Sequence, residues 1–254
     1  MTAAHSEDLF RYALRLGDDS LILGQRLGEW CARSPEMELD IALMNTSLDL
    51  FGRARTFLTY AGEVEGKGRD EDALAFLRDV GGFSNALLVE QPNGDYACTI
   101  ARQFLFDAFD VSFMTALTQS ADATLAAVAA KAVKESTYHL RFSRDWLVRL
   151  GDGTDESHDR MQAGLEEMWP FLHELFEMDA AEQRLVDAGI AVDRQALRAD
   201  VMARIEDALT EATLSRPADG WQPVGGRRGD HSEHLGFLLA EMQWMQRAYP
   251  GSQW

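Results

Sequence analysis

An acid and a histidine lie one helical turn apart in the segment 125–146, among mostly apolar residues that recur at helical spacing. The predicted buried face of this segment comprises Leu125, Val128, Ala132, Glu135, His139, Phe142 and Trp146. Asp107 occupies a similar position in the apolar stripe of 100–114. Carboxylates and imidazoles on the inward faces of a helical bundle are the ligand types of a di-iron site. Asp107, Glu135 and His139 are therefore the residues to test as metal ligands.

A complete di-iron site of this type takes a Glu from each of two helices and a Glu-x-x-His motif from each of two more. The residues three positions before the six histidines are Thr2, Ser136, Asp155, Pro170, Arg228 and His231. None of these is a glutamate, and three polar groups cannot replace six ligands. We therefore predict no metal site and no catalytic residue in this chain. For Glu135 and His139, a buried pair joined by a hydrogen bond is favoured over metal binding.

Two other groups of residues have ligand-like spacing. Asp155 and His158 come closest to the missing motif, but they follow a glycine-rich turn where a helix begins, so a solvated helix cap is favoured. His231 and His234 lie one turn apart, a spacing that zinc can use. Because the sequence suggests no third or fourth ligand, we favour helix capping or a subunit contact for this pair.

The glycine-rich stretch 225–229 contains Arg227 and Arg228 and could hold a phosphate on a helix N-terminus. It lacks the strand–loop–helix context of a nucleotide-binding loop, so a surface connection is favoured. The sequence contains no Gly-x-Ser-x-Gly elbow, and neither Cys31 nor Cys98 has a histidine nearby in sequence. Nucleophilic catalysis therefore has no motif to support it.

The composition limits the partners and the compartment. Among the 254 residues, 42 Asp and Glu oppose 24 Lys and Arg, and the formal net charge of −18 repels nucleic acid and anionic lipid. No apolar run approaches membrane-spanning length, and Met1–Asp8 does not resemble a signal peptide. The two cysteines fit neither a disulfide framework nor a metal-binding motif. We expect a cytoplasmic protein with no nucleic-acid or membrane partner.

The elements that position these residues are predicted to be helices throughout. The ranges are 5–16, 18–33, 36–64, 70–78, 97–119, 121–149, 155–177, 194–214 and 231–247, with Gly17 and other glycines at helix ends. In 36–64 a buried face is predicted from Leu43, Ser47, Leu50, Ala54, Phe57 and Ala61. We predict one all-α domain over 1–254, because a chain of this length can bury a single large core.

Two helix starts carry capping signals. Ser34 precedes Pro35 and Glu36, which predicts a capping residue followed by proline at the first helical position. Asp230 precedes Glu233 by three residues, the spacing of a capping box.

Several long stretches resemble one bacterial family. They are Leu16–Trp30 (LGDDSLILGQRLGEW), Asp40–Asn45, Asp49–Arg55, Glu90–Asp95, Lys131–His139, Arg149–Ser157, His231–Leu235 and Glu241–Gln243. Across residues 10–254 the chain resembles the PaaC family. Its members are subunits of the ring 1,2-phenylacetyl-CoA epoxidase, a multicomponent monooxygenase of phenylacetate catabolism that inserts one oxygen atom of O₂ into the ring of phenylacetyl-CoA.

The resemblance implies a ferritin-like four-helix bundle with additional flanking helices. It also implies a division of labour in which a PaaA-like catalytic subunit holds the di-iron centre, a reductase passes it electrons, and a small PaaB-like subunit completes the complex. This chain would then be a structural companion without a cofactor, forming a heterodimer with the catalytic subunit. Asp107, Glu135 and His139 would be the remnant of a degenerate site. The alternative is a metal-binding oxygenase in its own right that uses these three residues. A third possibility is a module that binds the phosphates of coenzyme A through Arg227 and Arg228.

Overall fold

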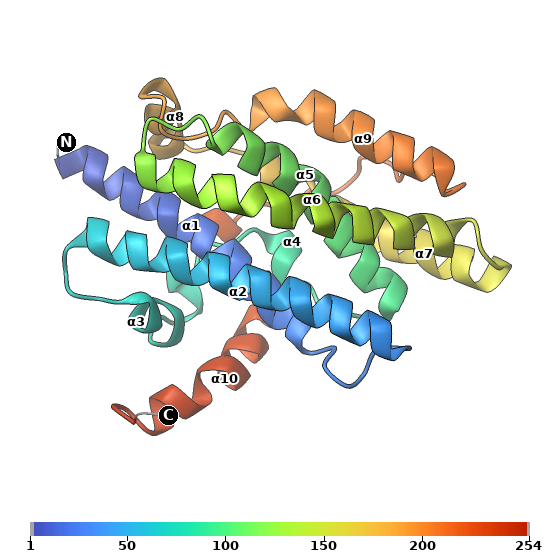
Figure 1. Cartoon of the computed structure of the whole chain (residues 1–254), viewed down its shortest axis with the longest axis horizontal. Coiled ribbons are helices and arrows are strands. Elements are labelled where there is room, and N and C mark those ends of the chain that lie inside the picture. Colours follow the sequence, from blue (N-terminus) through green and yellow to red (C-terminus); the bar gives the residue numbers. More distant parts are fainter. Residues whose placement is uncertain (1–2, 253–254) are drawn as a thin grey trace. The chain divides into compact units, whose positions relative to one another are not determined.

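A computed structural model describes the backbone of residues 3–252 and the side chains of 5–252. Within this range the chain forms helices and no strand, which confirms the all-α prediction (Figure 1). The α-helices are α1 (Ala3–Gly28), α2 (Met37–Glu65), α3 (Glu71–Phe76), α4 (Leu87–Glu90), α5 (Tyr96–Leu117), α6 (Ala123–Gly151), α7 (Asp155–Met168), α8 (Ala180–Asp187), α9 (Arg198–Glu211) and α10 (Glu233–Ala248). Among these residues, no helix is long and apolar enough to cross a membrane.

The helices group into two compact units. The first unit consists of 1–91 and 225–254, and the second of 92–224. The first unit is therefore discontinuous in sequence, since the chain leaves it after α4 and returns to it before α10. A single domain over 1–254 remains a prediction.

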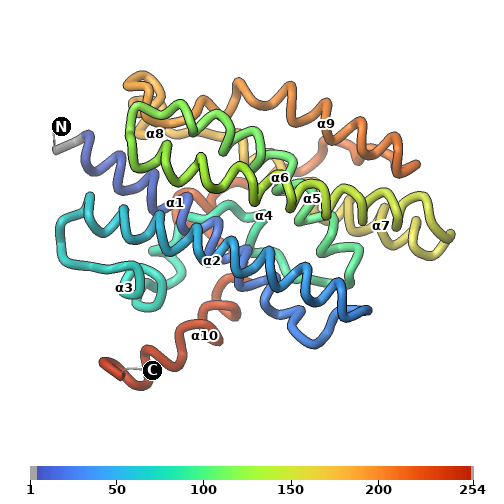
Figure 2. Tube along the Cα trace, in the orientation of Figure 1, coloured from blue at the N-terminus to red at the C-terminus, as the bar shows by residue number. Residues whose placement is uncertain are grey.

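The long helices α1 and α2 form the centre of the first unit and run antiparallel to each other (Figure 2). The predicted apolar face of α2 is confirmed, because Leu43, Ser47, Leu50, Ala54, Phe57 and Ala61 are all buried. The short helices α3 and α4 follow α2, and α10 packs against α3. Burial of one apolar face per long helix supplies the main driving force for this packing.

The predicted break at Gly17 is wrong, since α1 is one continuous helix from Ala3 to Gly28. A Cβ atom at Gly17 would lie 2.7 Å from Cδ2 of Leu58 on α2. Gly17 therefore allows the two helices to approach closely, and it does not end a helix. A single glycine in a helix interior costs only about 1 kcal/mol, which tertiary packing can outweigh.

Both predicted helix starts are also wrong. Helix α2 begins at Met37 after Glu36, whose side chain makes no capping hydrogen bond, so Ser34 and Pro35 lie outside the helix. Helix α10 begins at Glu233 after Ser232. The first free N–H group there is that of Ser232, and it donates to Glu90 Oε1 at 2.7 Å. A carboxylate distant in sequence thus takes the place of a local capping residue.

The second unit is built on α5, α6 and α7. Helix α5 is buried almost all round, whereas α6 buries a single face. The predicted helix 155–177 is shorter than expected, because α7 ends at Met168 and two 3₁₀ turns follow. Pro170 lies in the first of these turns, where its missing N–H group would break an α-helix. Helix α8 was not predicted from the sequence.

Two glycines of α2 offer a matched test of this packing. Gly52 has open space where a Cβ would lie, whereas a Cβ at Gly62 would come within 2.1 Å of the backbone oxygen of Arg69. We expect Gly52→Ala to raise the free energy of unfolding by up to about 1 kcal/mol through helix propensity. Gly62→Ala should lower it by about 1–3 kcal/mol through overpacking. Urea unfolding measures both, and equal effects of the same sign would contradict the arrangement.

Candidate functional site

Helices α5 and α6 hold two buried carboxylates at their contact. Asp107 accepts hydrogen bonds from Gln103 Nε2 at 2.7 Å and from Ser143 Oγ at 2.8 Å. One turn further along α5, Asp110 Oδ2 accepts from Ser136 Oγ at 2.6 Å. Both acids are nearly inaccessible to solvent. Hydrogen bonds from donors on the same and the facing helix offset the cost of burying these groups.

The three residues predicted as remnants of a metal site have different surroundings. Asp107 and His139 are buried, on α5 and α6 respectively. Glu135 is 19% exposed and forms an ion pair with Lys131, with 3.6 Å between its Oε1 and the lysine Nζ. Glu135 is therefore engaged in a surface pair along its own helix and is not fully buried as the periodicity predicted.

At several positions the buried face of α6 is shifted along the sequence by one residue from the predicted face. Its members are Leu125, Ala129, Ala132, Ser136, His139, Ser143, Leu147 and Gly151. Phe142 and Trp146 were predicted to face inward but are only partly buried. Serines take the inward positions because they are small and can donate to the two aspartates of α5.

The first unit contains a second buried polar network, which was not predicted from the sequence. Asp18 lies in the middle of α1 and is fully buried. Its carboxylate forms an ion pair with the Arg78 guanidinium, with 2.9 Å between Oδ2 and Nη1, and accepts from the Ser84 backbone N–H at 2.9 Å. The same guanidinium stacks 4.1 Å from the ring centre of Phe83. Asp18 thus fixes the chain that follows α3.

The next residue of α1 binds a segment much later in the chain. Asp19 forms an ion pair with Arg227, with 2.8 Å between Oδ2 and Nη2, and also accepts from the Ala86 backbone N–H at 2.7 Å. Arg227 also donates to the backbone oxygen of Ser84 at 3.2 Å. The residues 83–86 are therefore held between α1 and the returning C-terminal segment.

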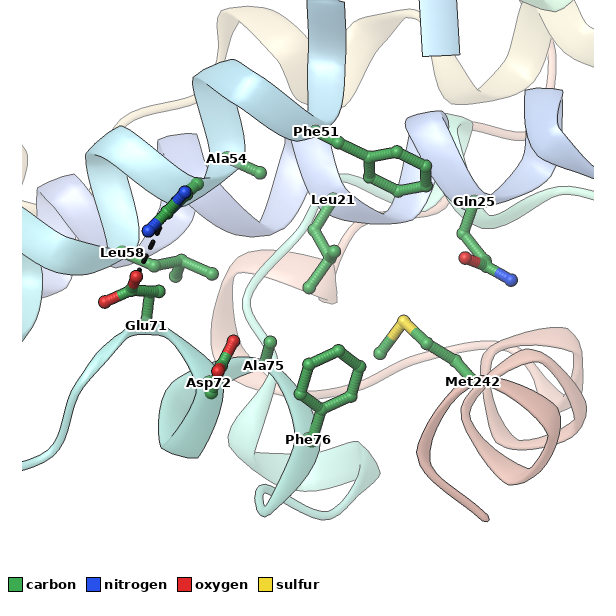
Figure 3. Close-up of a pocket in the computed structure, with 11 residues that line it drawn as sticks. Leu21, Gln25, Phe51, Ala54, Leu58, Glu71, Asp72, Ala75, Phe76 and Met242 are labelled. Atoms are coloured by element: carbon green, nitrogen blue, oxygen red, sulfur yellow. Dashed lines mark hydrogen bonds and ion pairs between the residues drawn. The ribbon is translucent and has the colours of Figure 1, made fainter. Parts of the chain in front are cut away.

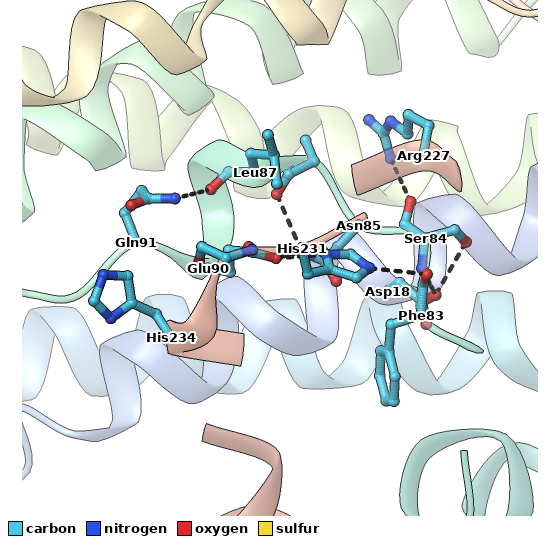
Figure 4. A network of polar contacts seen from close by, with 12 residues as sticks. Asp18, Phe83, Ser84, Asn85, Leu87, Glu90, Gln91, Arg227, His231 and His234 are labelled. Atoms are coloured by element: carbon cyan, nitrogen blue, oxygen red, sulfur yellow. Dashed lines mark hydrogen bonds and ion pairs between the residues drawn. The ribbon is translucent and has the colours of Figure 1, made fainter. Parts of the chain in front are cut away.

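Glu90 and His231 form the centre of this network (Figure 4). Glu90 accepts from His231 Nδ1 at 2.7 Å and from Asn85 Nδ2 at 2.8 Å, and both side chains of the Glu–His pair are fully buried. His231 Nε2 lies 3.0 Å from the backbone oxygen of Phe83. Both ring nitrogens thus face acceptors, an arrangement that suits the doubly protonated imidazolium.

The surroundings of His231 raise its pKa above the ordinary value. Burial by itself opposes the charged ring, but the hydrogen bond and the negative charge of Glu90, together with the carbonyl of Phe83, outweigh it. Arg26 connects α4 to the start of α10, because its Nη2 donates to the backbone oxygens of Glu90 at 2.7 Å and of His234 at 3.2 Å.

These contacts correct two interpretations of the sequence. The stretch 225–229 is not simply a surface connection, since Gly225 and Gly226 are buried and Arg227 is committed to Asp19. Of the two arginines predicted for coenzyme A phosphates, Arg227 is therefore already neutralised, whereas Arg228 is 63% exposed and its Nε lies 3.9 Å from Oδ2 of Asp230. His231 lies inside the unit and pairs with Glu90, so neither a helix cap nor a subunit contact describes it.

The other residues considered in the sequence are Asp155, His158 and the two cysteines. Asp155 lies in the first turn of α7, whose cap is Thr154. His158 Nδ1 lies 2.6 Å from the backbone oxygen of Gly151, at the end of α6. Cys31 is exposed and Cys98 is buried. Burial, assisted by the nearby Glu167 carboxylate, raises the pKa of Cys98 to about 12, so this thiol is not an activated nucleophile.

In the part of the chain that the structure describes, no three His, Cys, Asp or Glu side chains are grouped so that they could hold a metal ion. The buried acids of the first unit each accept hydrogen bonds from several donors, and these bonds connect different segments of the unit. Sequence reasoning missed Asp18 and Asp19, although two acids in the middle of a largely apolar helix were a usable signal. Their arginine partners are too distant in sequence to be found by periodicity.

The sequence matches one family of known proteins over its whole length. A family model described as phenylacetic acid catabolic protein (PaaA/PaaC) matches residues 1–254. The chain is 54% identical over 246 residues to the PaaC subunit of the 1,2-phenylacetyl-CoA epoxidase of Escherichia coli K12. This match covers 97% of the chain and 99% of that protein.

Replacement of Ser143 tests the α5–α6 network. Ser143→Ala removes one donor from the buried Asp107 carboxylate and should lower the free energy of unfolding by about 1–3 kcal/mol. Thr137→Ala on the exposed side of α6 removes a hydroxyl bonded only to its own helix, so it should change stability by less than about 0.5 kcal/mol. Chemical denaturation of the two variants measures the difference, and equal losses would contradict a role for Ser143 in satisfying Asp107.

The Glu90–His231 pair predicts a pH dependence of stability. The folded chain binds the His231 proton more tightly than the unfolded chain, so the free energy of unfolding falls as pH rises. The contribution is fully present below about pH 6.5, the ordinary imidazole pKa, and is lost as pH rises through the raised pKa of the folded state. His231→Gln should remove this slope, and the matched control His234→Gln should keep it. Denaturation curves between pH 6 and 9 measure the slope, which would persist in His231→Gln if the pair were not its cause.

Proposed function

Because the chain belongs to the phenylacetic acid catabolic protein family, we propose that it is a non-catalytic structural subunit of a phenylacetyl-CoA epoxidase. In this role it binds and stabilises a PaaA-like catalytic subunit that carries the di-iron centre. The observation that supports the proposal most strongly is the match to the PaaC subunit of the E. coli epoxidase over nearly the full length of both chains. A PaaB-like subunit and a reductase complete the proposed assembly.

The polar interiors of the two units are consistent with a structural role. Asp107 accepts from Gln103 and Ser143, and Glu90 accepts from Asn85, His231 and Ser232. Carboxylates engaged in this way stabilise the fold by satisfying buried donors. Asp107, Glu135 and His139 are retained in the proposal as the remnant of a degenerate site.

We also propose a ferritin-like fold over 1–254. Each unit contains one pair of long helices packed along each other, α1 with α2 and α5 with α6. The family to which the chain belongs supports a ferritin-like bundle, with the shorter helices as flanking elements.

Copurification with a tagged PaaA-like subunit tests the function. We expect a discrete heteromeric complex on size-exclusion chromatography, with close to two iron atoms per catalytic subunit. The isolated chain should contain substoichiometric iron that does not change on His139→Ala. A chain that remains monomeric beside the catalytic subunit would refute the structural role. Near-stoichiometric iron that disappears in His139→Ala would instead establish the alternative, a metal-binding oxygenase.

A further inference from the structure

Helix α2 carries a second apolar stripe, on a different side of the helix from the one that faces the core. Its members are Met37, Ile41, Met44, Leu48 and Phe51, at alternating spacings of four and three residues. Met37 is 73% exposed, Ile41 54% and Leu48 60%, while Met44 and Phe51 are partly buried. We call these five residues the α2 seam. A 4-3-4-3 repeat keeps one line of side chains facing a second helix, as in a coiled coil.

The α2 seam leads into a groove within the first unit (Figure 3). The groove has a volume of about 320 Å³ and lies between α1, α2, α3 and α10. Leu21, Phe51, Phe76 and Met242 point toward its interior, and Leu58 lines the side formed by α2. Phe51 belongs to both the seam and the groove. A helix lying along the seam could therefore insert a large apolar side chain next to Phe51.

Carboxylates lie at both ends of this apolar surface. Glu36, Glu38 and Asp40 lie at the Met37 end, and Asp72 lies beside the groove. None of the four forms an ion pair with another described residue. Arg55, at the groove, is already neutralised by Glu71, with 3.1 Å between Nε and Oε1. The surface thus offers apolar contact with a negative rim.

The charge indicates which occupant fits. A second copy of this chain would bring the same acidic rim against itself, in a protein with a formal net charge of −18, and like charges facing each other weaken association. A partner helix with Lys or Arg beside its apolar residues would complement the rim. Long basic side chains can also cover apolar surface with their methylene groups while their charges reach the carboxylates.

We infer that the α2 seam and its groove bind an amphipathic helix of the catalytic subunit, with apolar residues at a repeat of three and four and Lys or Arg on its flanks. This inference rests on the proposed function and assigns the partner to one face of the first unit. The two helices would cross at about 20°, the angle of seam-like packing. Leu48 lies near the middle of the contact, where truncations cost most.

The test uses the full chain and a tagged PaaA-like subunit. Ile41→Glu/Leu48→Glu should weaken the complex at least tenfold in Kd, because it places two acids in the apolar contact beside an already negative rim. Tyr138→Glu and Trp221→Glu are matched controls, since both replace exposed aromatic residues of the second unit. They should bind within about twofold of the unmodified chain. Thermal melting verifies that all variants remain folded.

A charge reversal tests the rim separately. Glu38→Lys/Asp40→Lys should slow association and reduce its dependence on salt, with a smaller effect on dissociation. Surface plasmon resonance at two salt concentrations measures these rates. Unchanged association would overturn the basic flanks assigned to the partner helix.

The outcomes separate the two proposals. If the unmodified chain fails to bind the catalytic subunit, the proposed function is wrong and this inference fails with it. If it binds and Ile41→Glu/Leu48→Glu binds equally well, the function stands and the assignment of the α2 seam is overturned. If the seam variants abolish self-association of this chain and leave the heteromeric complex intact, the occupant is a second copy.

Discussion

The ion pair between Asp19 and Arg227 joins positions 208 residues apart and closes the first unit. The chain leaves this unit after Gln91 and returns at Gly225, so a specific contact has to fix the returning segment. The returning segment begins at Gly225, which has φ near 148°. A Cβ atom at this position would lie 2.8 Å from Cβ of Asp230, so glycine is required there. Removal of one member of a buried pair costs about 3–5 kcal/mol, because an uncompensated charge remains. This pair and the Glu90–His231 pair together hold the segment that leads into α10.

Buried acids in this protein act as attachment points for backbone that has no regular structure. Asp18 and Asp19 accept from the N–H groups of Ser84 and Ala86, and Glu90 accepts from that of Ser232. These segments lack helical partners for their backbone groups, so side chains on α1 and α4 supply them. In the second unit, Asp107 and Asp110 play a related part between two helices. The residue types that would bind iron in a catalytic bundle are here engaged in holding the fold, which supports a structural role.

Helix α2 has a stripe of apolar residues on each of two faces, and the two stripes differ in their exposure to solvent. Leu43, Leu50 and Phe57 are buried against the remainder of the unit. Ile41 and Leu48 remain exposed at the same helical repeat. Exposed apolar residues in a continuous line indicate contact with another protein more strongly than scattered ones do. The inferred docking surface therefore follows from α2 having more apolar surface than the core requires.

Some features of this protein were determined by the sequence alone. Helical periodicity predicted the helical class and the position of most long helices, because both depend on residues three and four apart. The missing Glu-x-x-His motifs were equally readable, since that motif is local. Tertiary structure decided the remainder. Gly17 allows close packing of α1 against α2 where the sequence predicted a helix end, and Ser143 faces inward where Phe142 was expected. His231 found its partner in Glu90, 141 positions away in the chain. The α2 seam was distinguishable from the core face only by its exposure. The physical reason is common to these cases: side-chain periodicity specifies which residues share a face, whereas burial and pairing depend on what folds against that face.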